Sequence, residues 1–236
     1  MSNSLHARGI IFDLDGTLVD TPSALGASFV DCLARFGKKI TLEEGRTLAL
    51  DLQRQVAGRE STLTYMKAVN KIIKAQGIRG VLRRLKFLKE FIAIYHDLQR
   101  QTDAYDGVLE LLREIKTREL KIAIATSSSV PEMERIMTKI RDQVMPLVDA
   151  IVTRDDVKVV KPDPESVVVA AKQLALDFSE LVVIGDSWQD IRAGKQAGTR
   201  TIGVLWGFGS ENSLTNEKPT QLVSTPAEIL SFLDEI

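Results

Sequence analysis

Five short apolar runs stand out along the chain, each of a length typical of a buried strand. They occupy Gly9–Leu14, Lys121–Thr126, Ala150–Thr153, Leu181–Gly185 and Thr201–Leu205. Each is separated from the next by a stretch long enough to hold a helix. Because alternating strands and helices are typical of a parallel sheet covered on both faces, the pattern predicts an α/β fold with a Rossmann-like parallel sheet.

The long interval between the first two runs differs from the rest of the chain in its amino-acid composition. It is charged and rich in helix-forming residues, and it contains no comparable strand run. Thr21 and Pro22 resemble an N-cap followed by a proline in the first helical turn. We therefore predict an all-helical cap domain at 20–104, inserted into an α/β catalytic core formed by 1–19 and 105–236.

The composition of the chain excludes some classes of binding partner and of metal site. The chain has 236 residues and a net charge of −1, so it lacks the basic excess that attracts nucleic acid or membranes. One cysteine and two histidines exclude an internal disulfide and a zinc site of the cysteine/histidine type. With no leader-like start and no 18-residue apolar run, we expect a cytoplasmic protein, either monomer or homodimer.

Polar side chains follow the predicted strands. In open parallel sheets, ligands bind beyond the carboxyl ends of the strands, so these side chains are candidates for a site. They are Asp13, Asp15, Gly16, Thr126, Ser127, Ser128, Lys161, Asp186 and Asp190. Hard carboxylate oxygens without cysteine or histidine favour Mg²⁺, and crowded acids need a cation to offset their repulsion. We expect Asp13 and Asp186 to be its direct side-chain ligands.

Four segments resemble the ordered motifs of the haloacid dehalogenase superfamily. They read DLDGTLVD, IAIATSSS, KPDP and VIGDSWQDIRAGKQAG, and the tail GVLWGFGSENSL resembles the phosphoglycolate-phosphatase-like branch. The resemblance implies a phosphatase that acts on a small phosphorylated metabolite through an aspartyl-phosphate intermediate. Each motif is weak alone, but four in order are specific.

The resemblance also implies a role for each matching residue. Asp13 would attack phosphorus, and Asp15 would serve as general acid and then base while its carbonyl binds the metal. Lys161 would balance charge, and Asp190 would support the metal shell indirectly. Phosphate binding would fall to Thr126, to the loop of Ser127 and Ser128, and to the backbone at Gly16. For the two serines, a role limited to forming the turn is equally compatible with the sequence.

Two positions distinguish a phosphatase from the other activities of this superfamily. Family dehalogenases and phosphonatases typically lack an aspartate at the position of Asp15, whereas phosphatases and phosphomutases have one. The sugar phosphomutases that the chain resembles carry a histidine where this sequence has Leu25, which favours hydrolysis. A non-catalytic regulator that binds a phosphorylated metabolite is the alternative from another class.

The predicted cap contains one further candidate residue and one charged stretch. Arg59 matches a loop that often contacts substrate in this family, although it is equally compatible with a surface role. Eight basic residues and no acid fall within 67–89. That stretch is interpreted first as a solvated helix face, with attraction of anionic substrates or an acidic partner as the alternative. Cys32 is interpreted as a packing residue, and His96 as a packing or surface residue.

Overall fold

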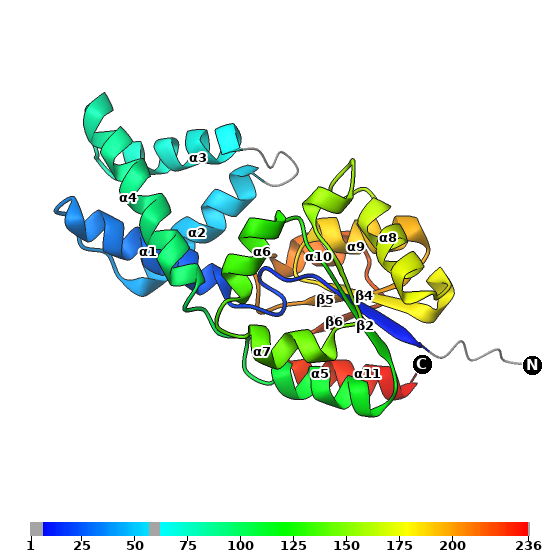
Figure 1. The fold of residues 1–236 in the computed structure, drawn as a ribbon. Helices are drawn as coiled ribbons and strands as arrows, with labels where there is room; N and C mark the ends of the chain where they lie inside the picture. Colours follow the sequence, from blue (N-terminus) through cyan, green and yellow to red (C-terminus); the bar gives the residue numbers. More distant parts are fainter. Residues whose placement is uncertain (1–6, 57–61, 236) are drawn as a thin grey trace, which may run out of the picture. The chain divides into compact units, whose positions relative to one another are not determined.

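A computed structural model describes residues 7–56 and 62–235 (Figure 1). The chain divides into two compact units. The first comprises the described residues of Met1–Asp20 and Asp103–Ile236, and the second is Thr21–Thr102. These limits lie within two residues of the predicted domain boundaries. The role of the second unit as a cap stays a prediction.

A six-stranded parallel sheet forms the centre of the first unit. Its strands are β1 (Gly9–Phe12), β2 (Lys121–Ala125), β3 (Ala150–Val152), β4 (Leu181–Gly185), β5 (Arg200–Val204) and β6 (Gln221–Val223). Their spatial order is β3-β2-β1-β4-β5-β6. The five predicted strands are confirmed to within two residues, and so is the α/β fold class. The edge strand β6 was not predicted.

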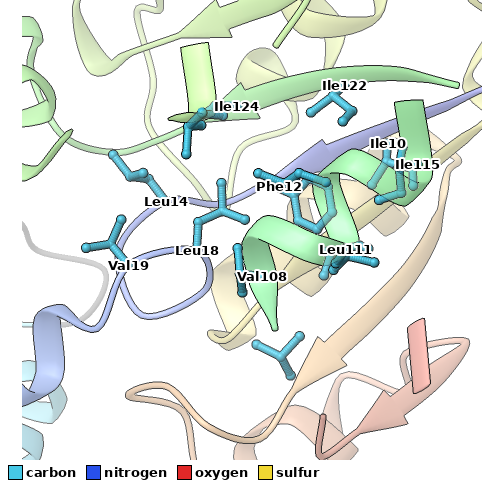
Figure 2. Close-up of a cluster of buried hydrophobic side chains, with 14 of the residues drawn as sticks. Ile10, Phe12, Leu14, Leu18, Val19, Val108, Leu111, Ile115, Ile122 and Ile124 are labelled. Carbon is cyan, nitrogen blue, oxygen red and sulfur yellow. The ribbon is translucent and has the colours of Figure 1, made fainter. Parts of the chain in front are cut away.

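Helices cover both faces of this sheet. They are α5 (Val108–Thr117), α6 (Val130–Met137), α7 (Arg141–Val144), α8 (Glu165–Leu174), α9 (Trp188–Ala197), α10 (Glu211–Asn216) and α11 (Pro226–Glu235). Short 3₁₀ turns occur at Met145–Leu147, Arg154–Asp156 and Phe178–Glu180. Successive strand residues point to opposite faces. Ile10 and Phe12 of β1 therefore pack with Leu111 and Ile115 of α5 (Figure 2), whereas Ile11 belongs to the core beneath α8 and α9.

The topology fixes where polar strand ends meet. Strand β1 is central and pairs with β2 on one side and β4 on the other, all in parallel. The chain segments that follow these three strands therefore emerge at one edge of the sheet. That edge carries the Asp13–Gly16 loop, the Thr126–Ser128 loop and Asp186.

Four helices build the second unit in the described part of the chain: α1 (Thr21–Arg35), α2 (Leu42–Val56), α3 (Thr62–Ala75) and α4 (Val81–Gln99). Phe29 of α1 packs on Phe91 of α4, with ring centroids 4.6 Å apart. Cys32 of α1 is fully buried, with its Sγ 3.7 Å from Phe87 O, and burial raises the pKa of its thiol to about 12. Its interpretation as a packing residue is confirmed. His96 lies half-buried on α4.

Among the described residues, no helix combines the length and apolarity needed to cross a bilayer.

Candidate active site

The loop after β1 brings two carboxylates to the sheet edge. The backbone N–H of Asp13 donates to Ile184 O at 2.9 Å, which continues the β1–β4 pairing past the end of the strand. The chain then turns at Gly16, whose φ is +83° and whose N–H donates to Val19 O at 2.9 Å. A Cβ on Gly16 would overlap the carboxylate of Asp186. Glycine is therefore needed both for the turn and for the close approach of the two acids.

Lys161 links the acidic groups of the site. Its Nζ donates to Asp13 Oδ1 at 2.8 Å, to Asp190 Oδ1 at 2.6 Å and to Ala125 O at 2.6 Å. Only 5% of this side chain is exposed. Burial opposes its charged form, but the carboxylates of Asp13 and Asp190 outweigh that effect and raise its pKa. Lys161 is therefore a protonated, buried cation that binds two acids at once.

The acids around Lys161 form a cluster that suits a divalent cation. Asp13, Asp186 and Asp190 are buried, and each offers a carboxylate oxygen within 4.8 Å of the others. Burial, opposed by Lys161, raises the pKa of Asp13 well above its usual value. Burial and the charge of Asp190 raise the pKa of Asp186 to about 7. One lysine thus leaves excess negative charge, which a cation bound by hard oxygens would offset, so the residues fit a divalent metal.

Asp190 has both carboxylate oxygens engaged by groups of the chain itself. Oδ1 accepts from Lys161, and Oδ2 accepts from the N–H of Ser187 at 3.0 Å and from the Ser187 hydroxyl. Ser187 and Asp190 form the capping box of α9. Asp190 thus both caps a helix and contacts the site through Lys161.

The segment Trp206–Gly209 after β5 encloses Asp186. Its Phe208 N–H donates to Asp186 Oδ2 at 2.6 Å. A Cβ on Gly207 would overlap the side chain of Asp186, and one on Gly209 would overlap its carbonyl. Sequence reasoning used this segment only as a family resemblance and missed its contact with the acid. The two glycines flanking Phe208 are the signal that could have indicated a close backbone approach.

Asp15 meets the loop that follows β2. Ser128 Oγ donates to Asp15 Oδ2 at 3.0 Å, and Thr126 Oγ1 lies 3.5 Å from the same oxygen. The N–H of Ser128 donates to Thr126 Oγ1 at 3.0 Å. Half-buried Ser127 lies between these two residues. Burial raises the pKa of Asp15 to about 6, against the bond from Ser128, and the nearby charge of Glu132 adds to the rise.

Hydrogen bonds join six of the predicted site residues into two sets. Lys161 joins Asp13 and Asp190, while Asp15 joins Thr126 and Ser128. Arg59 lies outside the described residues, so its role stays a prediction. Leu25, the position that separates hydrolysis from phosphomutase chemistry, is buried on α1 with 3% of its surface exposed.

Known proteins resemble the chain over nearly its whole length. It is 29% identical to pyrophosphatase PpaX of Bacillus pumilus, over 98% of each chain. It is 26% identical to phosphoglycolate phosphatase 1 of Pseudomonas aeruginosa, over 97% of this chain and 80% of that protein. A crystal structure of a candidate β-phosphoglucomutase from Thermotoga maritima superimposes with a TM-score of 0.77 at 26% identity, over 97% and 99% of the two chains.

One family model places the chain among known enzymes. It is described as haloacid dehalogenase-like hydrolase and matches residues 10–204. This match includes the β1 loop, the whole helical unit and the segments with Lys161, Asp186 and Asp190. The chain therefore belongs to the haloacid dehalogenase-like hydrolase family, as its four ordered motifs predicted.

Proposed function

We propose that this hydrolase is a Mg²⁺-dependent phosphatase of small phosphomonoesters that works through an aspartyl-phosphate on Asp13. The observation that carries the proposal is the buried contact of Asp13 with Lys161, inside a cluster of further carboxylates. A purely structural core has no need of like charges buried at converging strand ends, because each one costs desolvation energy. The same arrangement suits a nucleophile with its neutralising groups.

Asp13 is the proposed nucleophile because its carboxylate is both buried and oriented. Lys161 binds Oδ1, and the Thr17 hydroxyl lies 3.4 Å from Oδ2. A carboxylate oxygen would form a bond to phosphorus while the bond to the ester oxygen of the leaving group breaks. Water would then attack the aspartyl-phosphate, regenerating the carboxylate and releasing inorganic phosphate.

Asp15 is the proposed general acid and base. It would protonate the leaving oxygen in the first step and take a proton from the attacking water in the second. A pKa near 6 suits a group that must both donate and accept a proton near neutral pH. The Ser128 hydroxyl would hold its carboxylate in place.

The remaining residues would bind phosphate and metal. Asp13, Asp186 and the carbonyl of Asp15 are the proposed ligands of Mg²⁺, and Asp190 would act indirectly by holding Lys161. When bound, the cation would neutralise charge between the nucleophile and the dianionic phosphate. The proposed phosphate-binding groups are the hydroxyl of Thr126, the loop at Ser127 and Ser128, the backbone at Gly16 and the ammonium of Lys161.

The comparisons support a small phosphorylated compound as substrate. The relatives are named for pyrophosphate and for phosphoglycolate, so the reaction class is shared while the substrate differs. We propose that the helical unit of Thr21–Thr102, including Arg59, selects the substrate as a cap. The cytoplasmic location expected from the sequence belongs to the same proposal.

A sugar phosphomutase is the second candidate function. The resemblance to a candidate β-phosphoglucomutase structure favours it. Against it stands Leu25, an apolar residue that can transfer no proton where the mutases that the chain resembles carry a histidine. Water is therefore the favoured acceptor.

The test is phosphate release from a panel of small phosphate esters and pyrophosphate, with and without Mg²⁺. We expect turnover of at least one ester that requires Mg²⁺ and disappears in Asp13→Asn. No turnover of any compound would favour the non-catalytic regulator, and sugar-phosphate isomerisation without net phosphate release would favour the mutase. Unchanged turnover by Asp13→Asn would exclude Asp13 as nucleophile.

A further inference from the structure

Helices α3 and α4 of the second unit expose an unusual amount of apolar surface. Eleven large hydrophobic side chains are exposed among the described residues, and six of them lie on these two helices. They are Leu63, Met66, Val81, Leu82, Leu85 and Ile92. Leu82 is 84% exposed and Val81 64%. A contiguous exposed apolar patch on a folded protein marks an interaction site more often than scattered single residues do.

Part of this surface is hollowed into a groove between the two helices. The groove has a volume of about 250 Å³ and is lined by Met66, Lys67, Asn70, Val81, Arg84, Leu85 and Leu88. Val81, Leu85 and Leu88 follow one another at intervals of four and three residues, so they form one stripe along α4. Grooves of this kind, with an apolar stripe between two helices, suit the apolar face of a third helix.

The chain segment that lines the groove carries charge of one sign. Residues 62–89 contain eight basic residues and no acid. The whole chain has 31 basic and 32 acidic residues, so the rest of it carries 23 basic and 32 acidic, a net charge of −9. Two of the basic side chains, Lys67 and Arg84, line the groove itself. A solvated helix face would account for the basic residues. It would not account for the exposed leucines that lie among them.

We propose that the α3–α4 groove is a docking site for an acidic amphipathic helix of another protein. Its leucine-like side chains would fill the groove over Leu85 and Leu88, and its flanking Asp or Glu residues would face Lys67 and Arg84. A symmetric pair of copies of this chain would set Lys67 and Arg84 against the same residues of the other copy, which charge repulsion disfavours. The concave shape of the groove favours a helix over a flat lipid surface.

Binding of synthetic helical peptides to the full chain tests the proposal. The probe is a fluorescent peptide of about 18 residues, roughly 27 Å as a helix, built from Leu, Ala and Glu in an amphipathic pattern. Its counterpart carries Lys in place of every Glu. Fluorescence anisotropy should show binding of the Glu peptide only, and this binding should weaken with added salt because exposed charges are screened.

Variants on exposed positions locate the site. Leu85→Gln, and separately the double variant Lys67→Glu with Arg84→Glu, should each weaken binding of the Glu peptide about tenfold or more. The matched controls are Leu42→Gln on α2 and Lys172→Glu on α8, both at exposed positions, and they should bind as the parent does. Circular dichroism on each variant verifies that the helices are retained.

Several outcomes would overturn the proposal. Equal binding of both peptides, no binding of the Glu peptide, or binding that survives both α3–α4 variants would each do so. Sedimentation that shows a dimer lost in Leu85→Gln would instead make the surface a contact between copies. Tighter binding of the chain to vesicles of anionic phospholipid than to the Glu peptide would make it a lipid-binding surface. All of these readouts are independent of phosphatase activity.

Discussion

Gly207→Ala should weaken Mg²⁺ binding without changing any proposed metal ligand. The added methyl group would overlap the carboxylate and Cβ of Asp186 on one side and the backbone carbonyl of Gly16 on the other. Because one of these neighbours is backbone, turning a single side chain does not relieve the overlap. The Asp186 carboxylate must then move away from the Phe208 N–H, from which it accepts a bond at 2.6 Å.

The size of the effect follows from the groups involved. Overpacking costs typically about 1–3 kcal/mol, and a hydrogen bond to a charged group contributes about 1.5–3 kcal/mol. These two costs describe one displacement and are not added. At about 1.4 kcal/mol for each factor of ten, the affinity for Mg²⁺ should fall roughly 10- to 100-fold. Changes to groups that orient metal ligands have effects of this order.

Calorimetric titration of Mg²⁺ into the EDTA-treated protein measures this affinity directly. Gly203→Ala is the matched control, because the nearest neighbours of the same methyl group on β5 would be the side chains of Leu222 and Leu214 and not carboxylates. It should lower the free energy of unfolding and leave Mg²⁺ affinity within about twofold of the parent. If Gly207→Ala bound Mg²⁺ as tightly as the parent, the Trp206–Gly209 segment would not hold Asp186 in its binding position.

Three further predictions follow from the buried charges. In EDTA, the free energy of unfolding should fall as the pH rises from about 4 to 7, because folding raises the pKa of Asp186 to about 7 and the folded state therefore holds its proton longer. Urea denaturation at pH 5 and pH 8 measures this, and a slope unchanged in Asp186→Asn would contradict it. Mg²⁺ at about 100 times its dissociation constant should add about 2.7 kcal/mol and raise the melting temperature by roughly 5–11 °C. Differential scanning calorimetry should show that shift in the parent and not in Asp186→Asn. Lys161→Met should cost about 3–5 kcal/mol in EDTA, since it leaves buried carboxylates unpaired, and urea denaturation should show that Mg²⁺ stabilises this variant more than the parent. An equal gain from Mg²⁺ in both proteins would count against that reasoning.

The sequence predicts the sheet well where strands are fully buried. Ile10, Ile11 and Phe12 are all buried because helices cover both faces of β1, and such strands read as continuous apolar runs. Strand β6 lacks this signal. It has three residues at the edge of the sheet, and only Val223 among them is fully buried. A short edge strand is therefore hard to distinguish from a loop in the sequence.

In the site, the side-chain groups could be predicted from the sequence, whereas a backbone contact could not. Asp13, Lys161 and Asp186 could be predicted because their side chains stand at strand ends or in recognisable motifs. The Phe208 N–H could not, because every residue except proline carries such a group and its contact depends on a loop that lies 22 positions along the chain from Asp186. In the sequence, only Gly207 and Gly209 indicate that the backbone of this loop approaches Asp186 closely.

Asp190 combines a structural role, as part of the cap of α9, with a contact to the proposed catalytic residues. Its spacing from Ser187 matches a capping box, Ser-x-x-Asp, which begins α9. The cap fixes Oδ2, and the oxygen left over, Oδ1, accepts the bond from Lys161. The start of a helix thus sets the position of the cation that contacts Asp13. A substitution that weakens the cap, such as Ser187→Ala, should therefore disturb Lys161 and Asp13 even though three hydrogen bonds separate Ser187 from the proposed nucleophile.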